Sequence, residues 1–358
     1  MDVTVLICTC NRRDLLGETL DSLAEMAIPE SWRCEILVVD NGSTDDTRAA
    51  VLNRAPDSRL PVRYIYEPAL GKSNAMNAGI GTSDARVLAC TDDDVRVTRD
   101  WLTAGCAPLL ARSDGFAYTG GPVRPIWDGP CPGWFPRSPC DLWGTIAILD
   151  YGSNPFSFEE RRKVPLGANF ALRRDLIERI GGFVPCLGRS TTRVLLGQEL
   201  PEFFRRARTA GARGLYVPQM EVFHHIPAAR LTPAYCRRWW YGKGVSRSRV
   251  DRMHPITELG VDLRSVAHVA GVPRFMFGDA CRDLARWCAA ALQRDAAECV
   301  RLESRLSYFV GYTCERQRAR WSAITHQSAP ASIPPRSSAR VAAGLRTDSA
   351  HAPQRWTS

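Results

Sequence analysis

Three consecutive aspartates, Asp92, Asp93 and Asp94, have the types and spacing that most directly suggest chemistry in this chain. They follow an apolar run from Val87 to Cys90, which is typical of a short buried strand. Carboxylates crowded at a strand end repel one another unless positive charge neutralises them, and a divalent cation with oxygen ligands does so. The aspartates therefore predict a metal site, with a solvated acidic turn as the alternative.

The residues before these aspartates alternate predicted strands and helices, which is typical of an α/β fold with a mostly parallel sheet and helices on both faces. We expect strands at Val3–Ile7, Glu35–Val39, Val62–Tyr66 and Val87–Cys90, and helices over Asp14–Met26, around Arg48–Leu52 and over Ser73–Gly79. Ligands of such sheets bind beyond the carboxyl ends of the strands. Thr9, Asp40 and Asp92 stand at three of these ends, so we expect them to face one crevice.

Residues 120–165 are rich in proline and tryptophan, which indicates a long irregular segment, either a packed loop or a substrate lid. Beyond it we expect helices over 174–180 and 200–210 and a short strand over 214–218. Residues 256–320 look mostly helical, and the Ser-, Pro-, Ala- and Arg-rich end from about Ser328 predicts disorder.

Size and charge narrow the class of protein. The 358 residues, 45% hydrophobic and 24% charged, are typical of a soluble globular chain, and the net charge of +9 favours anionic partners. No apolar run approaches the roughly 18 residues of a membrane-spanning helix, which leaves a peripheral membrane contact open. Nucleic acid is excluded as a partner, because no motif supports it and the arginines are spread out.

The cysteines and the N-terminus bear on localisation. The 13 cysteines are scattered without a CxxC pair, so we interpret them as reduced thiols and do not favour a zinc site built from Cys131, Cys140 and Cys186. The acidic Met1-Asp2 start and the polar run from Thr9 do not match a signal peptide. We expect a cytoplasmic protein, with the inner face of the plasma membrane as an alternative site.

Two common nucleotide-binding motifs are excluded. Gly71-Lys72-Ser73 matches the end of a phosphate-binding P-loop, but Tyr66 stands where that loop needs a glycine. No GxGxxG follows a predicted strand, so a Rossmann dehydrogenase is unsupported.

Several sequence blocks instead resemble the family-2 glycosyltransferases. Four blocks are similar, in order and spacing, to the nucleotide-sugar domain: Val3–Arg12, Glu35–Thr47, Gly71–Gly79 and Thr91–Val95. Three later blocks resemble the acceptor-side and final catalytic segments: Leu166–Phe183, Leu196–Pro218 and Val222–Thr232. The resemblance covers roughly residues 3–245, and several blocks in register are far more specific than one motif.

This resemblance implies an A-type glycosyltransferase fold. It implies metal-assisted transfer of a sugar, with inversion, from a nucleoside-diphosphate sugar to a glycan or lipid-linked acceptor of the cell envelope. We expect a catalytic domain at 1–250, with a nucleotide-sugar half at 1–120 and an acceptor half at 121–250. A helical extension at 251–322 and a disordered tail at 323–358 would follow.

The resemblance also implies a metal site for Mn²⁺ or Mg²⁺. Asp94 matches a direct ligand, and Asp92 matches a contact to ribose or metal. Asp93 is the middle residue, assigned to the donor site or left as a solvated carboxylate. His224 matches the histidine that completes the metal site, with His225 as its competitor.

The donor-binding residues follow from the same match. Asp40 is expected to bind the base, with capping of the Asn41-Gly42-Ser43 turn as the alternative. Thr9 and Asn11 are expected to contact the nucleoside. Lys72 and Asn74 are assigned to the donor site, although Lys72 also fits an ordinary surface lysine.

Inversion needs a base that removes the proton of the acceptor hydroxyl, and we assign Glu199. Many relatives have Glu-Asp here, but this chain has Leu200 in the second position. Glu202 is the fallback, although helical spacing is expected to turn it outward. A non-catalytic paralogue that binds nucleotide sugars or glycans is therefore the alternative to an enzyme.

Two further features have open interpretations. Trp239-Trp240 with Tyr241 suits stacking on a sugar, a lipid headgroup or core packing. The arginines of the C-terminal helices suit either a basic surface on anionic lipid or a helical cap with solvated charges.

Overall fold

The computed structural model describes the whole chain except residues 56–57, 112–113, 190–193, 258–259 and 328–358. The chain divides at Arg320 into two units, of which the described parts are the residues of Met1–Ala319 outside the gaps named above and residues 320–327. Helix α9 (Ala296–Gln327) continues past residue 322, where we expected the extension to end. The disorder predicted from Ser328 lies outside the described residues.

The main sheet contains the predicted parallel strands. Its strands are β1 (Val3–Thr9), β2 (Cys34–Asp40), β3 (Val62–Tyr66), β4 (Val87–Asp92), β6 (Phe116–Gly120), β8 (Phe156–Ser157), β9 (Asn169–Arg173) and β10 (Arg213–Tyr216). Among the described residues the order is β3-β2-β1-β4-β9-β6-β10-β8. The α/β class is confirmed, and β1 to β4 are parallel as predicted.

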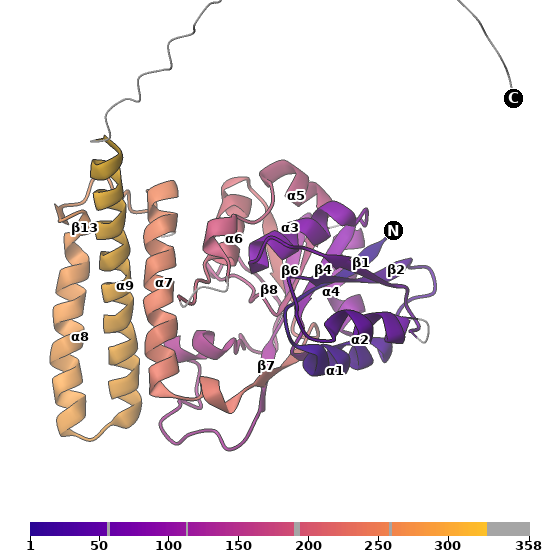
Figure 1. The fold of residues 1–358 in the computed structure, drawn as a ribbon, viewed down its shortest axis with the longest axis horizontal. Helices are drawn as coiled ribbons and strands as arrows, with labels where there is room; N and C mark the ends of the chain where they lie inside the picture. The colour runs from indigo at the N-terminus through magenta and orange to yellow at the C-terminus, as the bar shows by residue number, and fades with distance from the viewer. Residues whose placement is uncertain (56–57, 112–113, 190–193, 258–259, 328–358) are drawn as a thin grey trace, which may run out of the picture. The chain divides into compact units, whose positions relative to one another are not determined.

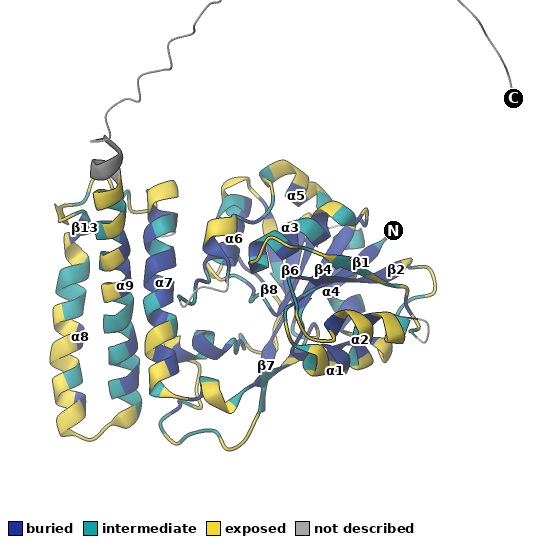
Figure 2. Ribbon diagram, in the orientation of Figure 1, coloured by how far each residue is buried: buried dark blue, intermediate teal, exposed yellow. Residues whose placement is uncertain are grey.

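Helices cover both faces of this sheet. They are α1 (Arg13–Ala24), α2 (Thr47–Arg54), α3 (Lys72–Thr82), α4 (Trp101–Ala111), α5 (Arg174–Ile180) and α6 (Glu199–Thr209). Figure 1 shows α3, α5 and α6 on one side and α1 and α2 on the other. The strands β1, β2 and β4 between these layers are almost fully buried (Figure 2), because most of their residues are apolar on both faces, whereas the edge strand β3 is partly exposed.

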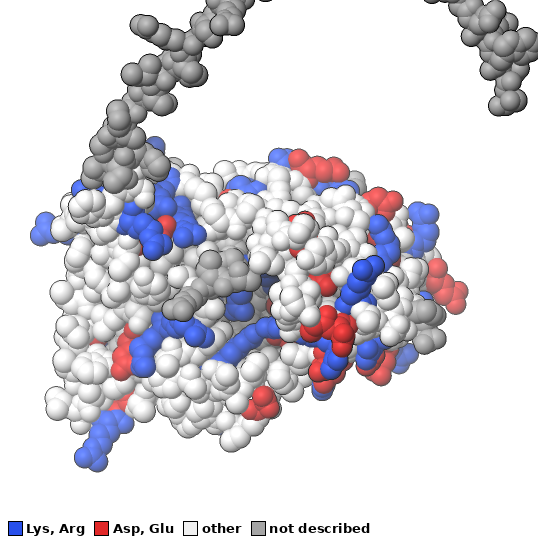
Figure 3. Space-filling view, in the orientation of Figure 1, with Lys and Arg blue, Asp and Glu red and all other residues white. Residues whose placement is uncertain are grey.

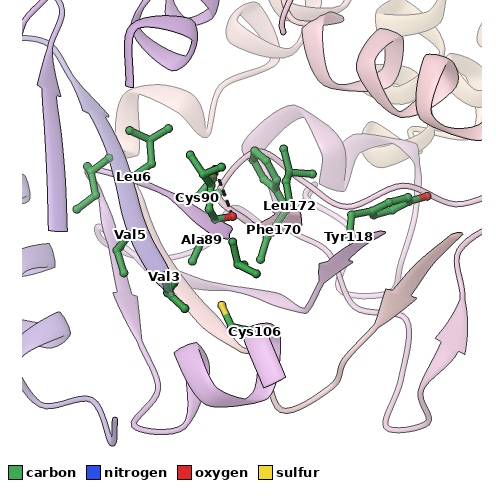
Figure 4. Close-up of a cluster of buried hydrophobic side chains, with 14 of the residues drawn as sticks. Val3, Val5, Leu6, Ala89, Cys90, Cys106, Tyr118, Phe170 and Leu172 are labelled. Atoms are coloured by element: carbon green, nitrogen blue, oxygen red, sulfur yellow. Dashed lines mark hydrogen bonds between the residues drawn. The ribbon is translucent and has the colours of Figure 1, made fainter. Parts of the chain in front are cut away.

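One central strand breaks the parallel pattern. β9 lies between β4 and β6 and is antiparallel to both, which makes the sheet mixed beyond β4. Phe170 and Leu172 of β9 join the core formed by Val5, Ala89 and Tyr118 (Figure 4). A continuous hydrophobic core therefore runs across the sheet from β1 to β6.

Asn169, at the start of β9, ties the main sheet to a second one. This side chain is fully buried, donates to the carbonyls of Pro122 and Met220, and accepts a 2.8 Å hydrogen bond from Trp101 Nε1. The second sheet has the order β5-β11-β7 within the described chain, formed by β5 (Val95–Val97), β11 (Val222–Ile226) and β7 (Val123–Trp127). Its strand β5 directly follows the Asp92–Asp94 turn in the chain.

The proline- and tryptophan-rich segment is more regular than expected. It contains β7, a 3-10 helix η2 (Asp141–Ile146) and β8. Its buried residues Phe135, Leu142 and Ile146 form a second core with Ile226 and Trp240. The segment is thus a packed one, because its aromatic residues anchor it against β11 and the long helix that follows.

The C-terminal part is helical, as predicted. It consists of α7 (Pro233–Met253), the short strands β12 (His268–Val269) and β13 (Val272–Pro273), α8 (Arg274–Leu292) and α9. Thr232 caps α7 by accepting a 3.1 Å hydrogen bond from the backbone N–H of Tyr235. Because α7 runs through residue 250, the expected end of the catalytic domain falls inside a helix.

Candidate active site

The expected convergence of strand ends is present for Thr9 and Asp92, whereas Asp40 does not line the cavity that these two share. In the parallel register, Thr9 lies beside Asp40, and Cys8 lies beside Asp92. A cavity of about 350 Å³ opens at this edge of the sheet. Of the predicted site residues, it is lined by Thr9, Lys72, Asp92, Asp93, Asp94, Glu199 and His224.

The acidic cluster is buried and neutralised by cations. Asp93 and Asp94 are 5% and 4% exposed, so the solvated reading of Asp93 was wrong. Arg12 Nη1 donates to Asp93 Oδ1 at 2.9 Å and to Asp94 Oδ2 at 2.6 Å. Burial raises the pKa of Asp93 to about 6, against the opposing charge of Arg12.

Lys72 faces the same cluster from the start of α3. Gly71 precedes it with a φ of 129°, a conformation that favours glycine, and the Lys72 N–H donates to the carbonyl of Arg189 at 2.8 Å. The Lys72 side chain pairs with Asp92 at 2.5 Å. It is therefore not an ordinary surface lysine, because its charge is directed at the cavity.

His224 lies opposite Asp94. β11 pairs with β5 so that His224 stands beside Val95, and His224 Nε2 lies 3.3 Å from Asp94 Oδ1. Burial would raise the pKa of Asp94, but His224, Arg12 and Arg230 together hold that pKa well below its usual range. His225, the competitor of His224, does not line the cavity, although its backbone N–H donates to the carbonyl of Asp94.

Glu199 is the first residue of α6 and is 7% exposed. Its Oε2 is buried without a hydrogen-bond partner among the described residues. Burial raises the pKa of Glu199 above its ordinary value, and the charges of Lys72 and Arg189 oppose this. A buried carboxylate with a free oxygen and a raised pKa is suited to accept a proton.

The neighbours of Glu199 have other roles. Leu200 also lines the cavity and packs close to Gly167, where an added Cβ would lie 2.8 Å from Leu200 Cδ1. Glu202 is 1% exposed, pairs with Arg206 at 2.7 Å and contacts His254 Nε2 at 2.9 Å. The expectation that Glu202 turns outward was wrong, because His254 at the end of α7 reaches it.

Three predicted donor residues lie outside the lining of the cavity. Asp40 accepts from the Ser43 N–H at 2.8 Å and from the Tyr64 hydroxyl at 2.7 Å, so it caps the turn. Asn11 has a φ of 53° and accepts from the Thr44 N–H at 2.7 Å. Asn74 donates to the carbonyl of Leu70 at 3.1 Å.

Sequence reasoning gave no role to four other lining residues, Asn41, Arg12, Arg189 and Arg230. Asn41 fixes the loop before α3, since it donates to the carbonyls of Glu67 and Ala69 and accepts from the Gly71 N–H at 2.6 Å. Asn41 and Arg12 lie inside the blocks that carry the family resemblance, which was the available signal. Arg230, the last residue of the 3-10 helix η4 (Ala228–Arg230), lies inside the block Val222–Thr232 and shares that signal, whereas Arg189 lies outside these blocks and gave none.

The tryptophan pair divides its roles. Trp239 lines the cavity, so stacking on a sugar stays open for it. Trp240 belongs to the second core and donates from Nε1 to Thr145 Oγ1 at 3.0 Å. Lys243 Nζ lies 5.3 Å and 4.3 Å from the centres of the Trp239 and Trp240 rings.

A preformed cluster of three His, Cys, Asp or Glu residues that would hold a metal is absent from the described residues. The donor set nevertheless fits one, because the carboxylate of Asp94 and the imidazole of His224 are both buried and adjacent. His224 Nδ1 has no hydrogen-bond partner among the residues described. All 13 cysteines are described and are free thiols.

Several of the C-terminal arginines are paired with acids. Arg305 pairs with Asp283 at 2.8 Å, and Arg286 pairs with Glu298 at 3.0 Å. Figure 3 shows basic side chains gathered where the later turns of α7 and α9 meet, and there Arg249 and Arg252 both contact Glu315. None of the helices that the structure describes combines the length and apolar character needed to span a bilayer.

Comparison with known proteins gives a consistent family. Residues 4–181 match the model of glycosyl transferase family 2. Succinoglycan biosynthesis protein ExoM of Rhizobium meliloti (strain 1021) is 30% identical over 263 residues, covering 72% of this chain and 78% of that protein. Glucosyl-dolichyl phosphate glucuronosyltransferase of Haloferax volcanii is 25% identical over 268 residues, covering 71% of this chain and 79% of that protein.

A solved structure has the same fold. Mannosyltransferase PcManGT from Pyrobaculum calidifontis, in complex with GDP-Man and Mn²⁺, is similar with a TM-score of 0.55 and 19% identity. The match covers 88% of this chain and 86% of that one. It confirms the A-type glycosyltransferase fold expected from the sequence.

Proposed function

The chain is a glycosyltransferase of family 2, and we propose that it transfers a sugar from a nucleoside-diphosphate donor to a hydroxyl of a glycan or lipid-linked acceptor, with inversion at the anomeric carbon. One observation carries this proposal. The buried carboxylate of Glu199, with a free oxygen, lines the same cavity as the cation-neutralised aspartates and the basic side chains. A proton acceptor and a charged site for a leaving group thus share one space.

The donor diphosphate would lie among the basic side chains of the cavity. Lys72, Arg12, Arg189 and Arg230 all line it, and each can hydrogen-bond to phosphate oxygens. As the bond from sugar to phosphate breaks, negative charge grows on the leaving oxygen. These cations would stabilise that charge most strongly in the transition state, which is what accelerates the reaction.

A divalent metal fits the same end of the cavity. Asp94 and His224 would hold it, with Asp92 as a further ligand or as a contact to the ribose. A bound Mn²⁺ or Mg²⁺ would act as a Lewis acid on the diphosphate. The Mn²⁺ in the PcManGT complex supports this assignment.

Glu199 would act as the base. It takes the proton of the acceptor hydroxyl while that oxygen bonds to the anomeric carbon, and the diphosphate leaves from the opposite face. A single displacement of this kind inverts the anomeric centre. The raised pKa of Glu199 suits this role, because a stronger base removes the hydroxyl proton more readily.

The nucleobase and the ribose of the donor would be recognised at the ends of the first two strands. Asp40 remains our assignment for the contact to the nucleobase, with Thr9 and Asn11 as contacts to the nucleoside, and Asp93 and Asn74 stay assigned to the donor site. Both carboxylate oxygens of Asp40 already accept hydrogen bonds, so a nucleobase would share or displace one of these hydrogen bonds. The deeply buried Thr9 is the assigned nucleoside contact that lines the cavity.

A polymeric or lipid-linked acceptor is suggested by the relatives. One acts in succinoglycan biosynthesis, and another is named for a dolichyl phosphate substrate. A peripheral contact with an anionic membrane stays a prediction, since many arginines of α8 and α9 are already paired with acids. The alternative of a paralogue that binds without turnover rests on Leu200 alone.

The test is release of nucleoside diphosphate by the full-length protein over a panel of UDP-, GDP- and TDP-sugars, with Mn²⁺, with Mg²⁺ and with chelator. We expect slow hydrolysis of one donor that depends on metal. Calorimetry on the same donors measures binding separately. Binding without turnover, even after an acceptor extract is added, would favour the binding paralogue. If the protein neither binds nor turns over any donor of the panel, the proposal is overturned.

A further inference from the structure

A second hollow, of about 190 Å³, lies near the reaction cavity and has no role in the transfer described above. Its walls include the rings of Trp127, Phe135 and Trp143 and the charged side chains of Arg124, Arg137 and Asp150. Trp143 and Ile148 face this hollow, while the residues between them, 144–147, line the reaction cavity. One short segment therefore forms a wall of both spaces.

The strand register places the two spaces along one face of the second sheet. β7 is parallel to β11, with Pro125 beside His224 and Trp127 beside Ile226. Directly paired residues of neighbouring strands point to the same face. Pro125 and Trp127 line the second hollow and His224 lines the cavity, so the two spaces follow one another along this face.

The aromatic walls are held in place. The Trp127 and Phe135 rings meet edge to face at 6.0 Å between centroids. Trp143 Nε1 donates to the carbonyl of Pro136 at 3.0 Å, which fixes the ring beside the hollow that it lines. Rigid aromatic walls of this kind lose little entropy when a ligand packs against them.

The polar groups of the hollow form one edge of it. Arg124 pairs with Asp150 at 2.5 Å and with Glu221 at 2.8 Å, and both Arg124 and Asp150 remain partly exposed, at 43% and 27%. A charged pair that is reachable from solvent offers both donors and acceptors. Aromatic faces with such an edge suit a molecule that is apolar on its faces and rich in hydroxyl groups at its rim.

We infer that this second hollow is an acceptor subsite, which binds a pyranose ring of the acceptor glycan next to the sugar that receives the transferred residue. The inference rests on the proposed function and names its substrate class, a saccharide longer than one sugar. The C–H faces of the pyranose lie against Trp127 and Trp143, and its hydroxyl groups bond to Arg124 and Asp150. The donor diphosphate is excluded from it, because the aspartate cluster and Lys72 lie in the other space.

Binding of neutral disaccharides to the full-length protein tests this subsite. Saturation-transfer NMR titrations would use cellobiose, lactose and maltose as probes, in wild type, Trp143→Ala, Trp127→Ala and Trp143→Phe. We expect wild type to bind at least one disaccharide and each alanine variant to bind it at least about tenfold more weakly. Trp143→Phe keeps a ring at this position and is expected to bind within a few-fold of wild type.

Trp134→Ala is the matched control, because Trp134 touches Phe135 from the same segment but does not line the hollow. It should bind the disaccharide as wild type does, and a loss equal to that of Trp143→Ala would overturn the subsite. Absence of binding by wild type would also overturn it. Donor hydrolysis by wild type is read in parallel: if it persists, only the subsite fails, and if it is absent, the proposed function fails.

Discussion

The two carboxylate regions of the cavity are built in opposite ways. At the Asp92–Asp94 turn every carboxylate contacts a cation: Lys72 for Asp92, Arg12 for Asp93, and Arg12 and Arg230 for Asp94, which also lies beside the His224 imidazole. At Glu199 one carboxylate oxygen has no hydrogen-bond partner among the described residues, and burial raises the pKa. Asp92 and Asp94 are arranged to keep their charge, because the cations around them lower their pKa values, whereas burial raises the pKa of Glu199, and of Asp93 within the first region.

This difference separates two kinds of catalytic work. A carboxylate that stays ionised is suited to bind cations, because its pKa is held low by the positive charges around it. A carboxylate that is destabilised as an anion is suited to accept a proton, because protonation relieves the cost of its burial. Substitutions in the two regions should therefore affect both activity and stability differently.

The largest effect is expected at Glu199. Glu199→Gln keeps the shape of the side chain but removes the proposed base, and we expect turnover to fall by about 10² to 10⁴-fold with donor binding unchanged. Steady-state transfer assays and calorimetry measure the two quantities. Glu202→Gln is the comparison, and an equal loss of turnover there would contradict the assignment of the base.

The same variant has a distinctive effect on stability. Burial raises the pKa of Glu199 in the folded state above its pKa in the unfolded state, so the folded state binds this proton more tightly. The stability that wild type gains from the bound proton is therefore lost as the pH rises from the unfolded-state pKa through the folded-state pKa. Glu199→Gln should therefore raise the thermal midpoint more at pH 8 than at pH 5. If Glu199→Gln is less stable than wild type at pH 8, the buried anion of Glu199 does not destabilise the fold, and the proposed difference between the two regions is wrong.

The next largest effect is expected at Asp94. Asp94→Asn removes the charge that would hold the metal and faces His224, and we expect turnover to fall on the order of 10²-fold. Chelation of wild type should give a comparable loss that added Mn²⁺ reverses, whereas the variant should not recover. Asp84→Asn, at a carboxylate that is 84% exposed, is the matched control and should behave as wild type.

A smaller effect is expected at Lys72. Lys72→Met removes a cation that would hold the donor phosphate, and we expect the donor dissociation constant to rise about tenfold while donor choice is unchanged. Calorimetry with the preferred donor measures this. Lys163→Met, at a lysine outside the cavity lining, should leave the constant unaltered, and equal weakening there would point to net charge rather than to this contact.

The pH profile gives the most gradual test of the comparison. Because Glu199 must be ionised to act as a base, kcat/KM of wild type should fall about tenfold per pH unit below the raised pKa of Glu199. The residual activity of Glu199→Gln should lack this acid limb. An acid limb that survives in the variant would assign it to another group.

The sequence predicted the parts of the site that depend on strand ends. Alternating strand and helix patterns located Thr9 and Asp92 correctly, because parallel strands bring their carboxyl ends to one edge. The environment of Glu202 was not predictable, since it depends on His254, which follows a helix far along the chain. The role of Arg12 was likewise hidden, because its partners are distant in sequence.

The middle of the chain shows the other limit of sequence reasoning. Prolines at residues 120–165 predicted irregular structure, yet β7 forms there because Val123–Trp127 pairs with β11, about one hundred residues later. The second hollow depends on that pairing. A pattern that identifies local structure carries no information about such a distant partner.

The antiparallel strand β9 has a consequence for how the chain folds during synthesis. β4 pairs with β1 along one edge, but its other edge stays unpaired until Asn169–Arg173 is synthesised, about eighty residues later. Until then the backbone groups of Val87–Asp92 form an open sheet edge, and such edges recruit other chains. A fragment ending at residue 120 should therefore aggregate rather than bind a donor, so the predicted donor half depends on a strand that the acceptor half supplies.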